Sequence, residues 1–219
     1  MLLKGFGVSL SVGLAAFLGA LIFGALAALG MLRGPIWLRY GLNTLSATLR
    51  GIPELVTMLL VFYGVPTLIN QAAEAQGWDW QLDLPPFFAG AVTLALIYGA
   101  FCAEVIRGAA IAVPAGQYEA CRALALPRRA ILLRSIGPQI LVRALPGLSN
   151  VWLVLLKATA LMSVIQLEEI MRMAQIAARA TRQPFYWFFL ASLAYLAASL
   201  ISIWIKTKLE RRSARALGL

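Results

Sequence analysis

The sequence predicts an all-α integral membrane protein, and three observations support this class. The chain has 219 residues, of which 61% are hydrophobic and 13% charged, whereas a soluble domain carries about a quarter charged residues. The apolar residues fall into runs that approach the ~20 residues a helix needs to cross a bilayer. Lys and Arg gather between alternate runs, as is typical of loops on the cytoplasmic side. We therefore expect one membrane-embedded domain over residues 1–219.

Five runs are long and apolar enough to be membrane spans. We expect them at about residues 8–32, 52–72, 87–108, 148–167 and 185–206. The first run could instead be a secretory signal, but a signal carries its positive charge in front. Here only Lys4 precedes the run, while Arg33 and Arg39 follow it, which favours a membrane helix.

The distribution of basic residues predicts the orientation. Arginines are concentrated between spans one and two and between spans three and four. Lysines and arginines are also concentrated in the segment after span five. By the positive-inside rule these segments are cytoplasmic, so the N-terminus lies outside and the C-terminus inside. The net charge of +10 then reflects topology, and nucleic acid is not an expected partner. The outer segment before Pro184 has helical periodicity and mixed charge, which favours a helix along the interface.

The residue inventory excludes several kinds of catalysis. The chain has no histidine and only two cysteines, which rules out a Ser-His-Asp or Cys-His enzyme and argues against a metal site. No phosphate-binding G-x-x-x-x-G-K-[ST] loop occurs. We expect Cys102 and Cys121 to be small packing residues rather than a disulfide, and we expect no cofactor bound by this chain.

One segment between spans three and four is neither apolar nor loop-like. Residues 117–126 are strong helix formers, and Pro127 ends the pattern. Tyr118 and Leu124 could fill a groove on a partner, and Glu119 sits in the first turn, where the helix dipole favours an anion. The residues alone leave two readings open, a docking helix or an amphipathic helix held by anionic lipid. Residues 128–136 favour a second short helix, which Pro138 should interrupt.

The same segment resembles a known motif. The stretch "YEACRALALPRRAILLRSIGPQILVRALPGLSN" is similar to the E-A-A motif of ABC-transporter permease subunits, in particular those for polar amino acids of the histidine/lysine/arginine/ornithine type. The stretches "LRGIPELVTMLLVFYG", "YGAFCAEVIRGAAIAVPAGQYEA", "ALPGLSNVWLVLLKATAL" and "QPFYWF" also resemble that family. The resemblance implies the type I ABC importer permease fold, with residues 117–126 as the coupling helix that enters a cleft of the cytoplasmic ATPase.

The match to the motif is residue by residue, with three departures. Glu119 and Ala120 match, Cys121 replaces an alanine, Ala125 stands at the motif glycine, and only the proline of Gly137-Pro138 matches. Because alanine disfavours a positive φ, we expect the bend to depend on Pro127 instead. The resemblance assigns ATPase coupling to Tyr118, Glu119, Ala120, Cys121, Leu124 and Ala125.

Polar residues inside the spans are candidates for a transport path. Lys157 lies within span four, where facing lipid would cost ~2.5–3.5 kcal/mol, so it should face the bundle interior or a wet cavity. It could meet a substrate carboxylate, or it could be a structural lysine bonded to carbonyls or to an acid. Thr159 and Asn150 add polar atoms in the same span, and the family resemblance adds Tyr98. Glu104 and Arg107 are spaced to pair, as a local ion pair or as a gate.

The resemblance also implies a function and partners. The chain would be the permease subunit of an ATP-driven importer in the bacterial inner membrane, for polar amino acids, with basic amino acids or related opines favoured. It would not be an enzyme, because ATP and Mg would bind a partner ATPase dimer. A second permease subunit, with a heterodimer favoured, and a periplasmic amino-acid-binding protein would complete the assembly. The alternatives are a stand-alone secondary transporter or channel, which predicts matched broken helices, and a non-transporting scaffold.

Overall fold

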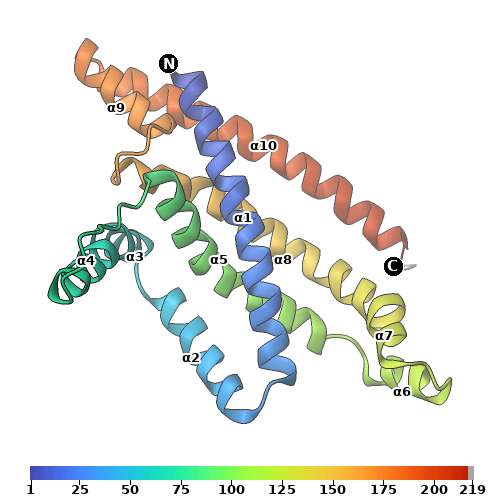
Figure 1. The fold of residues 1–219 in the computed structure, drawn as a ribbon. Helices are drawn as coiled ribbons and strands as arrows, with labels where there is room; N and C mark the ends of the chain where they lie inside the picture. The colour runs from blue at the N-terminus through green and yellow to red at the C-terminus, as the bar shows by residue number, and fades with distance from the viewer. Residues whose placement is uncertain (217–219) are drawn as a thin grey trace.

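The structure is a computed structural model that describes residues 1–216, and every regular element in that part of the chain is helical. Five helices are long and apolar enough to cross a membrane, as the sequence predicts (Figure 1). They are α1 (Leu2–Arg33), α3 to α4 (Glu54–Ala75), α5 (Pro86–Ile111), the helix Ile131–Ser163 that contains α8 (Gly137–Ala158), and α10 (Pro184–Ala216). The fold is therefore all-α with five candidate spans.

The centre of the fold is the pair α1 and α5, which pack side by side. Small residues recur every fourth position on the buried face of α1, at Ala16, Ala20, Gly24 and Ala28. Such spacing lets two backbones approach closely where no hydrophobic effect drives helices together. At Gly24 the approach leaves no room for a side chain, since an added Cβ would lie 2.5 Å from Cys102 Cβ. Cys102 and Cys121 are both free and buried, which confirms them as packing residues.

Two membrane helices contain a π-helical turn, and in both cases a proline follows it closely. The turn Leu60–Gly64 (η1) precedes Pro66, and the turn Ile131–Ile136 (η2) precedes Pro138. A proline cannot donate a backbone hydrogen bond, and its ring meets the carbonyl four residues earlier, which here lies within the widened turn. This explains why Pro138 does not interrupt the helix as expected. The helix that contains most of the predicted fourth span (about 148–167) therefore begins well before it and extends over Ile131–Ser163.

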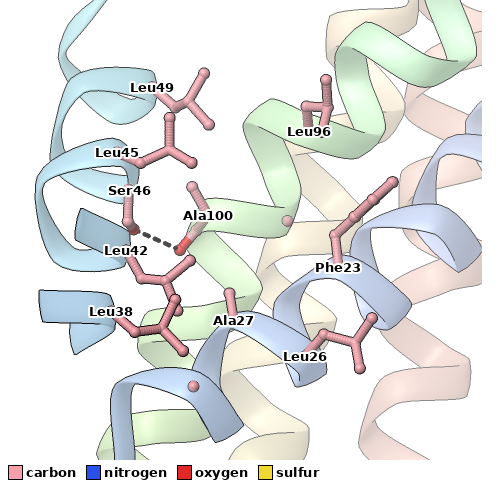
Figure 2. Close-up of a pocket in the computed structure, with 12 residues that line it drawn as sticks. Phe23, Leu26, Ala27, Leu38, Leu42, Leu45, Ser46, Leu49, Leu96 and Ala100 are labelled. Carbon is pink, nitrogen blue, oxygen red and sulfur yellow. Dashed lines mark hydrogen bonds between the residues drawn. The ribbon is translucent and has the colours of Figure 1, made fainter. Parts of the chain in front are cut away.

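The segment after α1 differs from the loop that its arginines suggested. Residues Ile36–Gly51 form α2, which leans on α1 and α5 through one row of leucines (Figure 2). Ser46 Oγ, on the same face, donates to the carbonyl of Ala100 at 3.3 Å. Between the three helices lies an apolar cavity of about 350 Å³, lined by Leu38, Leu42, Leu45, Leu49, Phe23 and Leu96 among others. The leucines in "LRYGLNTLSATL" recur at spacings of four, three and four residues, which is the signal that could have indicated this helix.

At the opposite end of the fold, α9 (Ile170–Thr181) is amphipathic and packs on α1 and α10. Glu169 caps it, accepting hydrogen bonds from the N–H groups of Met171 (2.9 Å) and Arg172 (2.8 Å). This carboxylate is fully buried, and Oε2 also accepts from Tyr195 Oη of α10 at 3.1 Å and from Ser9 Oγ of α1 at 3.2 Å. Burial raises the pKa of Glu169, while the two backbone donors act in the opposite direction. Glu169 therefore ties three helices together.

Candidate functional site

The predicted docking helix exists as a separate element. It is α6, Ala115–Ala123, which is shorter at its C-terminal end than the expected 117–126. Pro114 precedes it as the N-cap, and the short α7 (Arg128–Ala130) follows and leads directly into η2. Figure 1 shows α6 and α7 at the end of the molecule remote from the N-terminus, beyond the end of α5. The helix thus projects from the bundle without crossing it.

The two faces of α6 differ in their surroundings. Cys121 is buried and its Sγ lies 3.2 Å from Ser135 Oγ, and Tyr118 is half-buried beside the C-terminal end of α1. Glu119 and Ala120 are exposed, and Leu124 is 73% exposed. A large apolar side chain displayed this way is suited to contact another surface. The structure thus divides the six predicted coupling residues into an inward pair, Tyr118 and Cys121, and an outward set, Glu119, Ala120, Leu124 and Ala125.

The end of α6 corrects the expectation about Ala125. This residue takes a left-handed conformation with φ of 51°, although alanine disfavours it. The N–H of Leu126 bonds the carbonyl of Cys121 (3.2 Å), and the N–H of Ala125 bonds that of Arg122 (2.9 Å). These two bonds form a Schellman motif, which usually has glycine at the left-handed position. The turn therefore depends on Ala125 as well as Pro127, and the geometry that glycine favours is retained without glycine.

The polar residues of the fourth span lie on two different faces. Asn150, Val154 and Lys157 are exposed and follow one another at helical spacing, with Pro146 one turn before them. Thr159, by contrast, is buried, and its Oγ1 lies 3.1 Å from Tyr195 Oη and donates to the carbonyl of Leu156. Lys157 therefore does not face the interior of this chain's own bundle. Its charge must be matched by water or by another molecule, since lipid would penalise it.

Tyr98 lies away from that exposed face. It is 2% exposed, and its hydroxyl donates to Glu54 Oε1 at 2.8 Å. The bond joins α5 to the first turn of α3 (Glu54–Leu59). The structure thus gives Tyr98 a clear packing role and does not bring it together with Asn150 and Lys157 on one face.

The predicted pair of Glu104 and Arg107 is present, and Arg50 joins it as a third member. Arg107 Nη2 lies 2.7 Å from Glu104 Oε2, and Arg50 Nη2 from α2 lies 3.5 Å from Glu104 Oε1. One carboxylate therefore binds two arginines from two helices. Because all three side chains are partly exposed, each contact contributes modestly to stability, and the cluster chiefly fixes the end of α2 against α5.

No metal-binding group is evident among residues 1–216, where His, Cys, Asp and Glu side chains do not gather in threes. Sequence reasoning did not find the buried Glu169. Its position just before the helical pattern of residues 170–181 was a usable signal, because the helix dipole favours a negative charge at a helix N-terminus.

Comparisons with known proteins agree with this architecture. Residues 20–215 match the family described as binding-protein-dependent transport system inner membrane component. The chain is 37% identical over 217 residues to the histidine/lysine/arginine/ornithine transport system permease protein of Escherichia coli K12, covering 97% of this chain and 92% of that protein. It is 36% identical over 216 residues to the octopine transport system permease protein of Rhizobium meliloti, covering 99% and 91%. A solved amino acid ABC transporter with histidines has a chain of 27% identity and a TM-score of 0.82, covering 96% and 93%.

Proposed function

We propose that this chain is the permease subunit of an ATP-driven importer for polar amino acids. The chain belongs to the family of binding-protein-dependent transport system inner membrane components. Relatives that match nearly its whole length are permeases for basic amino acids and for octopine. Basic amino acids or opines are therefore the favoured cargo. In such systems the ATPase is a separate subunit, and no enzymatic role falls to this chain.

The observation that carries the coupling role is the outward face of α6. Glu119, Ala120 and Leu124 are exposed on a short helix whose other face is held to the bundle by Cys121 and Tyr118. A helix that is anchored on one side and free on the other can insert into a cleft of a partner. We assign that cleft to the cytoplasmic ATPase dimer, where ATP and Mg bind. Nucleotide-driven closure of the ATPase pair would then move α6 and switch the path between its inward- and outward-open states.

The translocation path lies on the exposed face of α8. Asn150 and Lys157 point away from the chain's own core, so a second permease subunit would complete the path around them. The ammonium of Lys157 is suited to meet the α-carboxylate that all amino acid cargoes share. The pairing we favour is a heterodimer, with the N-terminus outside and the C-terminus inside the bacterial inner membrane.

A cationic cargo also needs an acid, and this chain offers few. Glu54 already accepts the hydroxyl of Tyr98, and Glu104 binds two arginines. Neither lies on the face that carries Lys157, which is on a different helix. Selectivity for a basic side chain therefore comes from the second permease subunit or from the periplasmic binding protein, and this chain contributes recognition of the carboxylate.

The test is reconstitution of this chain with a second permease, an ATPase and a binding protein encoded beside it. Proteoliposomes should import labelled arginine, lysine, histidine or octopine only with ATP and loaded binding protein, and loaded binding protein should stimulate ATP hydrolysis. Cargo flux through liposomes that contain this chain alone would instead support the stand-alone transporter. Import that continues when Lys157 is replaced by Leu would remove the path assignment.

A further inference from the structure

The inner end of α1 and the coupling helix enclose a space that the transport mechanism does not use. An apolar cavity of about 350 Å³ lies between α1, α5 and η2, lined by Ala28, Leu29, Leu32, Ala110, Ile131 and Ile136 among others. A second cavity of about 620 Å³ adjoins it and is lined by Arg33, Tyr118, Arg122, Leu126 and Ile131. Arg33, Tyr118 and Ile131 line both. The combined space therefore has an apolar part and a part bordered by two arginines.

The two arginines in the second cavity are available for a ligand. Arg33 ends α1 and Arg122 lies in the last turn of α6, and both are exposed. Among the ion pairs formed by the part of the chain that the structure describes, none involves either residue. Guanidinium groups bind phosphate oxygens in a bidentate geometry, which an ammonium cannot reproduce. The mouth of the combined space is therefore complementary to a phosphate group.

We propose that this space is a binding site for one anionic phospholipid, with the phosphate on Arg33 and Arg122 and an acyl chain in the apolar cavity. The apolar part argues against a soluble phosphate, which would leave it unfilled. The charged part argues against a purely apolar occupant. Tyr118 lies between the two parts, which is the position that its apolar ring and polar hydroxyl favour at a membrane interface.

Such a lipid would join elements that otherwise share few contacts. Arg33 belongs to α1, which packs at the centre of the fold, whereas Arg122 belongs to α6, which projects from it. A phosphate held by both would fix the distance between the coupling helix and the central helix. The site does not depend on the identity of the cargo or on the coupling role.

The experiment uses the full chain in detergent micelles with an equimolar mixture of dioleoyl-phosphatidylglycerol and dioleoyl-phosphatidylcholine, analysed by native mass spectrometry. We expect the ratio of phosphatidylglycerol to phosphatidylcholine adducts to exceed one by about tenfold, since basic residues near a surface favour anionic lipid. The double variant Arg33→Gln/Arg122→Gln should bring the ratio close to one. The matched control Arg39→Gln removes a neighbouring exposed arginine that lines neither cavity, and it should leave the ratio high.

A second variant tests the apolar part. Leu29 is 48% exposed and lines the apolar cavity, so Leu29→Trp should fill that space without disturbing the core and should reduce the adducts of both lipids. A ratio that stays high in the double variant, or falls equally in the Arg39 control, overturns the site. The last test adds inorganic phosphate, with sodium chloride of equal ionic strength as its control. If phosphate abolishes the preference for phosphatidylglycerol and sodium chloride does not, the site binds a soluble anion, which also overturns the lipid assignment.

Discussion

Cys121 Sγ on α6 lies 3.2 Å from Ser135 Oγ on η2, so α6 touches the helix that carries Lys157. That helix runs without a break from Ile131 to Ser163. A displacement of α6 can therefore reach the proposed path through one continuous helix, without a separate chain of contacts. This gives the proposed coupling a physical route.

Reversing the charge at Glu119 should uncouple the transporter. Because this side chain is exposed and belongs to the face assigned to the ATPase, Glu119→Arg should leave the fold intact. It should lower ATP-driven import by about tenfold or more, which is the scale of a docking hot spot. The measurement is uptake and stimulated ATP hydrolysis in proteoliposomes. The matched control Glu74→Arg changes an exposed acid in the last turn of α4, and a similar defect there would argue against a docking role for Glu119.

Glycine at position 125 should stabilise the protein. Ala125 has φ of 51°, and relief of this left-handed alanine should raise the free energy of unfolding by ~0.5–1 kcal/mol. The control is Ala123→Gly in the last turn of the same helix, which should lower it by ~0.5–1 kcal/mol. Chemical denaturation in mild detergent measures both. Equal destabilisation by the two substitutions would contradict the role of Ala125 in the turn.

Truncation of Glu169 should be among the more destabilising single changes. Glu169→Ala leaves the N–H groups of Met171 and Arg172, and the hydroxyls of Ser9 and Tyr195, without their shared acceptor. Loss of a cap and of buried acceptors should lower the free energy of unfolding by ~2–3 kcal/mol. The neighbouring Glu168 is exposed, so Glu168→Ala should change stability by less than ~0.5 kcal/mol. Indistinguishable unfolding curves for the two variants would refute the assignment.

Replacement of Lys157 should separate transport from stability. The side chain is exposed on the single chain, so Lys157→Leu should not weaken the fold of this subunit. It should reduce import by about tenfold if the ammonium meets the cargo carboxylate, since a hydrogen bond to a charged group contributes ~1.5–3 kcal/mol. Lys157→Arg keeps the charge and should retain part of the activity. Uptake kinetics in reconstituted complex measure both, and full activity of the leucine variant would favour the scaffold interpretation.

An added methyl group should weaken the packing of α1 on α5 at Gly24 but not at Gly7. At Gly24 an added Cβ would lie 2.5 Å from Cys102 Cβ, whereas at Gly7 it would meet nothing within 4 Å. Gly24→Ala should therefore lower the free energy of unfolding by ~1–3 kcal/mol through overpacking. Gly7→Ala should be neutral or slightly stabilising, because alanine favours a helix. Resistance to denaturation in mixed micelles measures the difference, and matching values would argue against the close approach.

Much of the fold could be predicted from local patterns. Hydropathy identified five spans because a span needs ~20 apolar residues whatever surrounds it. The helix at 117–126 and the pairing of Glu104 with Arg107 follow from spacing along one helix, which is local information. The continuation of the helix Ile131–Ser163 through Pro138 was not predicted. A π turn that accommodates a proline leaves no mark in a hydropathy profile.

The sequence by itself determined the class, the number of spans and the family, since each depends on composition or on short runs of residues. Only the tertiary structure decided which face each polar residue occupies. It buried Tyr98 and Thr159, left Asn150 and Lys157 outside the bundle, and placed Glu169 where three helices meet. The physical reason is that a residue's surroundings are set by the rotation and crossing of helices distant in sequence, and local propensity carries no information about either.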